Sequence, residues 1–203
     1  MILKTLKYTR FGMLSDDVLD ACMDIEGLIL AGGAVRDTLF GARPSDYDMF
    51  LTHDTDVEKV KAYFLEREFV NVFTCPQGKL FTYMKGEDFK KPETCVKVQI
   101  IVKRTYDDVQ DLISSFDFSA TYFGLEWDDD ADQFLVHTSR QAIKDVRKKQ
   151  LSLVNLEYPS STINRLYKYR AKGYYVGHVI KEIVQMIASM DGYNPDDDEL
   201  YID

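Results

Sequence analysis

Residues 28–51, LILAGGAVRDTLFGARPSDYDMFL, decide the fold of this chain. Their first three residues are apolar and favour a strand, and the following Gly32 and Gly33 allow a backbone turn that other residues resist. Residues 34–40 suit a short helix that ends at Gly41. Free N–H groups at the start of a helix attract an anion such as a triphosphate, and Arg36 lies one turn further on.

A second strand is predicted directly after this turn and helix, over residues 46–51 (DYDMFL). Side chains two residues apart on a strand share a face and lie about 7 Å apart, so Asp46 and Asp48 are expected to point the same way. Mg²⁺ in proteins takes one or two carboxylates together with substrate phosphate oxygens. We therefore predict that Asp46 and Asp48 are catalytic and bind Mg²⁺. A Gly-Gly pair or an Asp-x-Asp alone is typical of an ordinary turn, and their combination in this order indicates a nucleotidyltransferase.

The segment GGAVRDTLFG followed by SDYDMFL resembles the head domain of the tRNA nucleotidyltransferase (CCA-adding) and bacterial poly(A) polymerase family. This family belongs to the polymerase-β-like nucleotidyltransferases. The resemblance implies an α+β head with a mixed sheet and a short C-terminal helical neck-like segment. It also implies that Asp46 and Asp48 hold catalytic metals, and that Gly32, Gly33 and Arg36 bind the triphosphate.

A second segment, residues 111–122 (DLISSFDFSATY), resembles the family motif in which an arginine pair precedes Asp-Phe-Thr and contacts the sugar of the nucleotide. Asp117 and Ser119 match this motif, so the resemblance implies that they bind the nucleotide. Ser115 and Phe116 stand where the arginines would be. This departure leaves the choice of NTP open.

Two further matches concern charged residues. Residues 162–174, TINRLYKYRAKGY, resemble the arginine-rich helix that begins the family's neck. The resemblance implies that Arg165 and Arg170 bind the nucleotide, and the alternative is that they are surface arginines of a helical neck. Asp37 matches the acid of the first motif. It either has a direct role in the chemistry or is a solvent-exposed helix residue.

A third metal ligand is the weakest part of the predicted site. Polymerase-β-like sites usually have a third carboxylate on a neighbouring strand, which helps to hold the metal and accepts the proton of the attacking hydroxyl. The expected strand, residues 95–102 (CVKVQIIV), offers Gln99, a weak metal ligand that cannot serve as a base. Three alternatives stay open. Two carboxylates are enough for catalysis, another acid such as Asp117 or Glu93 provides the third ligand, or the chain binds nucleotide without catalysis.

Composition predicts one main domain and argues against a protein that grips nucleic acid over a large surface. The 203 residues are 45% hydrophobic, which is enough for one sizeable core. We expect a nucleotidyltransferase domain over residues 1–157, a helical neck-like appendage over 158–192 and an acidic tail over 193–203. The net charge is −9, whereas nucleic-acid-binding proteins normally carry a basic footprint. Template, body and tail regions that the family uses on tRNA are not expected here, so a partner chain is a candidate to supply them.

The remaining sequence signals favour a soluble, cytoplasmic protein with no membrane partner. The three cysteines are odd in number and far apart, which indicates neither a disulfide framework nor a zinc site. The three histidines have no metal-ligand spacing. No apolar run approaches the roughly 20 residues of a membrane span, and the amino terminus is not typical of a signal peptide.

Periodicity and turn residues predict the elements. Strands are expected over residues 28–30, 46–51, 69–74, 80–84, 95–102, 121–127 and 133–137. Helices are expected over residues 16–24, 34–40, 56–68, 107–115 and 139–148, with two more after Pro159.

Together these features predict a metal-dependent nucleotidyltransferase that moves a nucleoside monophosphate from an NTP, with ATP among the candidates, to an acceptor hydroxyl. The resemblance implies that the acceptor is an RNA 3′ end. Two alternatives stay open: nucleotidylation of a protein or small-molecule hydroxyl, and a non-catalytic nucleotide-binding module.

Overall fold

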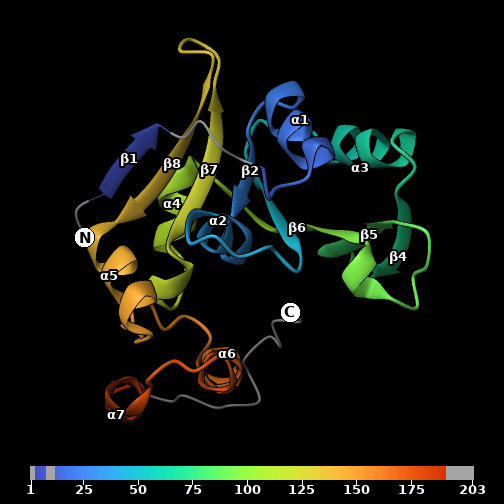
Figure 1. The fold of residues 1–203 in the computed structure, drawn as a ribbon. Helices are drawn as coiled ribbons and strands as arrows, with labels where there is room; N and C mark the ends of the chain where they lie inside the picture. The colour runs from blue at the N-terminus through green and yellow to red at the C-terminus, as the bar shows by residue number, and fades with distance from the viewer. Residues whose placement is uncertain (1–2, 8–11, 191–203) are drawn as a thin grey trace.

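The structure is a computed structural model that describes residues 3–7 and 12–190. Its strands are β1 (Leu3–Lys7), β2 (Leu28–Ala31), β3 (Tyr47–Thr52), β4 (Val70–Thr74), β5 (Leu80–Lys85), β6 (Val96–Tyr106), β7 (Phe123–Asp128) and β8 (Gln133–Ser139). Within the described residues they form one sheet in the order β1-β8-β7-β2-β3-β6-β5-β4 (Figure 1). Strands β3 and β6 run parallel, and the other neighbouring pairs are antiparallel. The predicted α+β class and mixed sheet are thereby confirmed.

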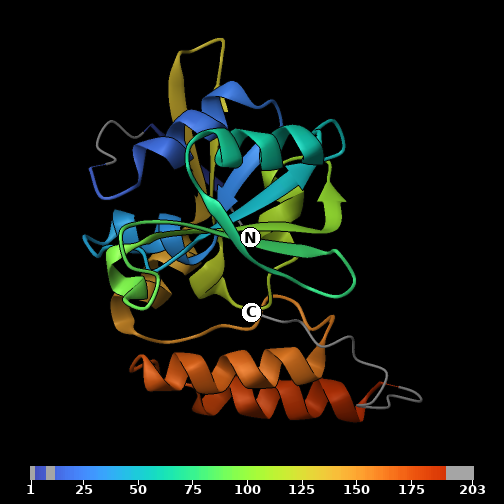
Figure 2. The same cartoon turned by 90° about the vertical axis from the view of Figure 1, so that its right-hand side faces the viewer.

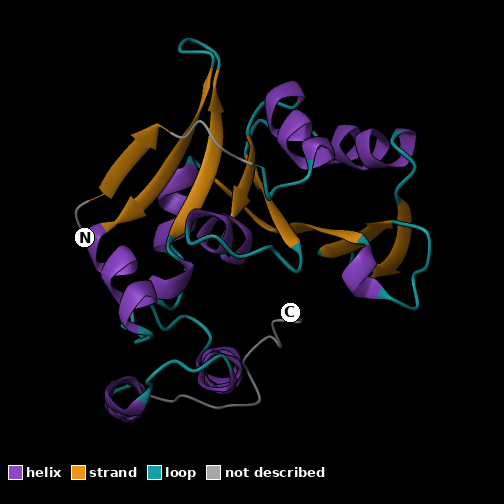
Figure 3. Ribbon diagram, in the orientation of Figure 1, coloured by secondary structure: helices purple, strands orange, loops and turns teal. Residues whose placement is uncertain are grey.

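The helices are α1 (Asp16–Asp24), α2 (Gly33–Leu39), α3 (Val57–Glu66), α4 (Val109–Ser114), α5 (Arg140–Lys148), α6 (Pro159–Ala171) and α7 (Gly177–Ala188). Figure 3 distinguishes these helices from the strands of the sheet by colour. Helices α6 and α7 form an adjacent pair below the sheet-containing part of the molecule (Figure 2). Among the helices of residues 3–7 and 12–190, none has the length and apolar composition needed to cross a membrane.

Several helices begin where a side chain accepts hydrogen bonds from the first free N–H groups. Asp56 accepts from the backbone N–H of Glu58 and Lys59 at the start of α3, and Ser139 accepts from Ala142 at the start of α5. Such caps satisfy donors that have no partner within the helix. Helix α4 packs closely on β7, since a Cβ on Gly124 would lie 2.4 Å from Val109. A side chain there would force the helix away from the sheet.

The elements differ from their predicted extents in ways that have physical causes. Strand β1 was not predicted, and it pairs along the edge of β8. Strand β6 continues to Tyr106, beyond the predicted end at residue 102, because its register with β3 shifts at a bulge and the pairing then resumes. Helix α3 ends at Glu66, and Glu68 adopts a positive φ of 67° that no helix tolerates. The predicted acidic tail over 193–203 lies outside the described residues.

Candidate active site

The Gly-Gly turn lies directly beside the carboxylate of Asp48. Gly32 has φ +76° and ψ −129°, a conformation that a residue with a side chain rarely adopts, and its N–H donates to the Phe123 carbonyl at 2.8 Å. A Cβ added to Gly32 would lie 4.0 Å from Oδ2 of Asp48. The turn predicted to bind phosphate and one of the predicted catalytic carboxylates therefore face each other.

Strand pairing also places Gln99 next to Asp48. In the register of the sheet, Asp48 on β3 lies opposite Ala31 on β2 and opposite Gln99 on the parallel strand β6. Directly paired residues project from the same face of a sheet. Asp46 comes immediately before β3 and is half-buried, as is Asp48. Asp48 and Gln99 are therefore neighbours on one face of the sheet, near the beginning of β3, and Asp46 lies two residues before Asp48.

Lys97 joins this group, and the sequence predictions did not include it. Its Nζ lies 3.2 Å from Oδ2 of Asp46, while the Ser45 hydroxyl donates to Oδ1 of Asp46 at 2.9 Å. The alternation of CVKVQIIV already places Lys97 and Gln99 on one face of their strand. What the sequence did not reveal is the lateral register that brings this face against Asp46.

The donor set suits one hard cation that shares its ligands with a substrate. In the part of the chain that the structure describes, no three His, Cys, Asp or Glu side chains gather in a way that would hold a metal ion. Two carboxylates and an amide oxygen nevertheless match the needs of Mg²⁺, which commonly takes the remaining ligands from phosphate and water. The residues present therefore fit Mg²⁺ together with a nucleotide.

Arg36 is buried, and its contacts connect helix α2 to helix α6. Its Nε donates to Asp37 at 2.7 Å, and its Nη1 donates to the Tyr169 hydroxyl at 2.9 Å and to the Ala120 carbonyl at 3.4 Å. Burial alone would lower the pKa of Arg36, but Tyr169 and Asp37 outweigh it and the pKa is raised. A Cβ on Gly33 would lie 3.6 Å from Nη2 of Arg36, so this permanent positive charge borders the turn. Its contact with a triphosphate stays a prediction.

Asp117 and Ser119 are both buried and both have protein partners. Arg165 Nε donates to Oδ2 of Asp117 at 2.6 Å. Ser119 donates to Oδ2 of Asp145 at 2.5 Å, and Asp145 is fully buried. These contacts are all within the protein, and contacts of Asp117 and Ser119 with a nucleotide stay predictions. Glu93, the other acid considered as a third ligand, is exposed in the short helix Pro92–Thr94.

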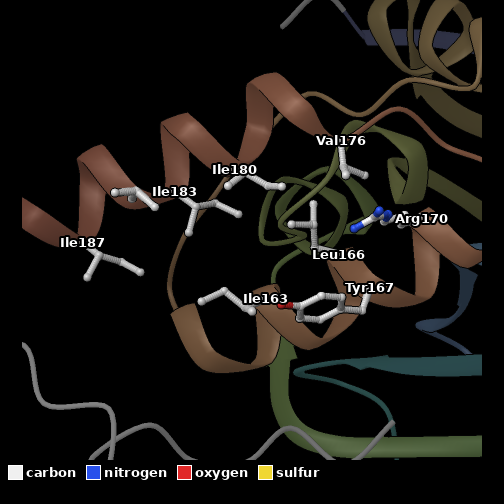
Figure 4. Close-up of a pocket in the computed structure, with 9 residues that line it drawn as sticks. Ile163, Leu166, Tyr167, Arg170, Val176, Ile180, Ile183 and Ile187 are labelled. Atoms are coloured by element: carbon white, nitrogen blue, oxygen red, sulfur yellow. The ribbon is translucent and has the colours of Figure 1, made fainter.

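The two arginines of α6 lie in different surroundings. Arg165 reaches Asp117, whereas Arg170 is exposed and lines a groove between α6 and α7 beside Leu166 and Val176 (Figure 4). Five residues correspond to about 140° around a helix, which separates the two side chains. The structure thus places Arg165 and Arg170 apart, and nucleotide binding by either residue stays a prediction.

Comparison with known proteins shows a family and a fold. A family model described as "Gad2: Gabija anti-defense 2 family protein" matches residues 4–149. No curated protein sequence matches the chain. Similar solved structures include a CCA-adding enzyme in complex with ATP (TM-score 0.60, 11% identity, 91% of this chain and 46% of that chain). Another is the Thermotoga maritima CCA-adding enzyme complexed with tRNA (TM-score 0.55, 13% identity, 86% of this chain and 43% of that chain).

At these identities the structural similarity establishes the fold. The chain has a nucleotidyltransferase-like fold and spans less than half the length of those enzymes. The fold that the resemblance implies is thereby confirmed, while the family model that matches is not that of the tRNA enzymes.

Proposed function

The chain belongs to the Gabija anti-defense 2 family, and we propose that it is a metal-dependent nucleotidyltransferase that modifies a protein of the Gabija defence. The observation that carries this proposal is the approach of the Gly32 turn to Asp48, which is paired with Gln99 in the sheet. A turn without side chains next to carboxylates is suited to a metal-bound triphosphate.

The proposed reaction is transfer of a nucleoside monophosphate. The oxygen of an acceptor hydroxyl attacks the α-phosphorus of the NTP, the bond from that phosphorus to the β-phosphate bridging oxygen breaks, and pyrophosphate leaves. The proton of the hydroxyl passes to the carboxylate of Asp48, because the amide of Gln99 accepts no proton. Mg²⁺ bound by Asp46, Asp48 and the Gln99 amide oxygen would neutralise charge on the triphosphate. Arg36, next to Gly33, adds a fixed positive charge at the turn.

A protein acceptor is favoured by the family and by the charge of the chain. The family name says that its members counter Gabija. A net charge of −9 opposes a large contact with a phosphate backbone. An RNA 3′ end is the second candidate acceptor, because one of the structural neighbours is a complex with tRNA.

The test is to incubate the purified chain with Mg²⁺, each α-labelled NTP, and either the proteins of a Gabija system or total RNA. Label on a Gabija protein supports the proposal, and label on RNA alone moves the second candidate to first place. Absence of transfer to either class with all four NTPs would contradict the nucleotidyltransferase function.

Matched variants identify the site of the transfer. Asp48→Asn should lower the rate of labelling by at least about a hundredfold, the scale of one general base. Asp129→Asn, on the exposed hairpin between β7 and β8, changes the same group far from the site and should leave the rate unchanged.

A further inference from the structure

The ammonium of Lys97 lies at a position in the candidate site where a metal ion could otherwise bind. Its ammonium lies 3.2 Å from Oδ2 of Asp46, and the two side chains are 32% and 34% exposed. Lys97 is two residues before Gln99 on β6, and Gln99 is paired with Asp48. The strand therefore fixes Lys97 on the same face as the carboxylates.

Lys97 and Gln99 change the total charge of the candidate site. Three carboxylates would give the site a charge of three negative units, which two divalent cations and a triphosphate can balance. Here Asp46 and Asp48 provide two negative charges and Lys97 provides one positive charge, while Gln99 is neutral. The charge of this site is therefore two units more positive than that of a site with three carboxylates. This difference equals the charge of one divalent cation.

Geometry leads to the same conclusion. Mg²⁺ binds carboxylate oxygens at about 2.0–2.1 Å, so a second ion on Oδ2 of Asp46 would share that oxygen with the ammonium of Lys97. Two cations on one oxygen repel each other strongly in a half-buried site.

We propose that Lys97 is the built-in second cation of this site, so that the nucleotide binds with one divalent ion instead of two. Its ammonium neutralises Asp46 before the nucleotide arrives and contacts the triphosphate when the nucleotide binds. This inference rests on the proposed function, since it assigns the charge balance of the same nucleotide site.

Counting bound ions tests the inference without relying on turnover. Mn²⁺ and a non-hydrolysable ATP analogue are titrated into the purified chain, and free Mn²⁺ is measured by electron paramagnetic resonance. The wild-type complex should hold one Mn²⁺ per chain. The double variant Lys97→Met with Gln99→Glu restores three negative charges and should hold two.

The single variant Lys97→Met should weaken binding of the nucleotide about tenfold at saturating Mn²⁺, the size of one charge-assisted contact. Lys97→Arg keeps the charge and should retain one Mn²⁺ and most of the affinity. The matched control is Lys85→Met on β5, which removes an ion pair with Asp17 of similar length (2.9 Å) and similar exposure (34%). This control should change neither the number of bound Mn²⁺ ions nor the affinity for the nucleotide. Circular dichroism checks that each variant is folded.

The outcomes separate this inference from the proposed function. Two Mn²⁺ per wild-type chain with normal nucleotide binding would refute the role of Lys97 alone, as would an unchanged affinity in folded Lys97→Met. A folded wild-type chain that binds no nucleotide at all would refute both.

Discussion

Asp46 and Asp48 have different neighbours although they point the same way. Asp46 is bound by Lys97 and Ser45, and Asp48 faces the Gly32 turn. In the proposed function both carboxylates connect a metal ion to the nucleotide. Removing both charges should therefore affect the part of nucleotide binding that depends on Mg²⁺.

We predict that Asp46→Asn with Asp48→Asn abolishes the gain in affinity that Mg²⁺ gives to a non-hydrolysable NTP in calorimetry. The amides keep the size of the side chains, so circular dichroism should stay native. Asp130→Asn with Asp132→Asn, an exposed pair with the same spacing, is the control. Unchanged Mg²⁺-linked binding in the first double variant would exclude these two residues as metal ligands.

Ser119 allows a direct test of a structural role against a binding role. Its hydroxyl is one of three donors to the fully buried Asp145, together with the amides of Gln141 and Gln150. From these contacts we predict that Ser119→Ala lowers the free energy of unfolding by about 1–3 kcal/mol, because a buried charge loses a donor.

Urea denaturation gives this free energy, and calorimetry on the same sample gives the affinity for the nucleotide. Ser189→Ala, at an exposed hydroxyl after α7, should change neither quantity. Loss of nucleotide affinity in Ser119→Ala without loss of stability would instead support the binding role that the motif implies.

At the scale of elements, helix α6 is held to the sheet-containing part by polar and aromatic contacts. Tyr169 accepts a hydrogen bond from Arg36 and stacks edge-on against Phe118, and Arg165 pairs with Asp117. Burial raises the pKa of Tyr169 to about 12, although Arg36 opposes the rise.

This shift predicts how alkaline conditions affect stability. An unfolded tyrosine has a pKa near 10, so the folded chain holds the proton of Tyr169 more tightly than the unfolded chain does. The stabilisation is complete below about pH 10 and is lost as the pH rises towards the folded value. Tyr169→Phe removes this dependence, and at neutral pH it should cost about 1–3 kcal/mol because Arg36 loses an acceptor.

Urea unfolding at pH 8, 10 and 11 measures the effect, and the difference between wild type and Tyr169→Phe should shrink as the pH rises. Other titrating groups are the same in both chains and cancel. Tyr167→Phe on the same helix is 64% exposed and should behave as wild type. A difference that stays constant over this pH range would contradict the role given to the Tyr169 proton.

Elements and site were predictable from the sequence to different degrees. The order of Gly32, α2 and β3 followed from turn glycines and alternation, which are local signals. Strand β1 was missed because its pairing with β8 joins residues more than 120 positions apart. Lys97 was missed for the same reason, since the lateral register of β6 with β3 is a long-range property. The partners of Arg165 and Arg170 depend on how α6 docks, which helical periodicity alone does not define.

For the whole molecule, charge and family point away from a tRNA enzyme that works alone. The chain has a net charge of −9, and the family model that matches it is not that of the tRNA enzymes. One group of basic side chains lies on α5 and α6, which include Arg147, Lys148 and Lys168. Only a few phosphates can be contacted there.

We therefore predict that purified chain binds deacylated tRNA weakly and with a shallow dependence on salt. A protein that makes six to ten phosphate contacts loses about 10³–10⁵ in affinity between 50 and 200 mM salt, because each contact releases counterions. Two or three contacts on α5 and α6 should lose only about tenfold to fortyfold over this range. Filter binding across a salt series measures the slope, and Arg147→Gln with Lys148→Gln should flatten it further, whereas Lys90→Gln with Lys91→Gln near β5 should not. Nanomolar affinity with a steep slope would contradict the protein-directed proposal and restore an RNA acceptor, since so strong a phosphate contact would serve no purpose on a protein substrate.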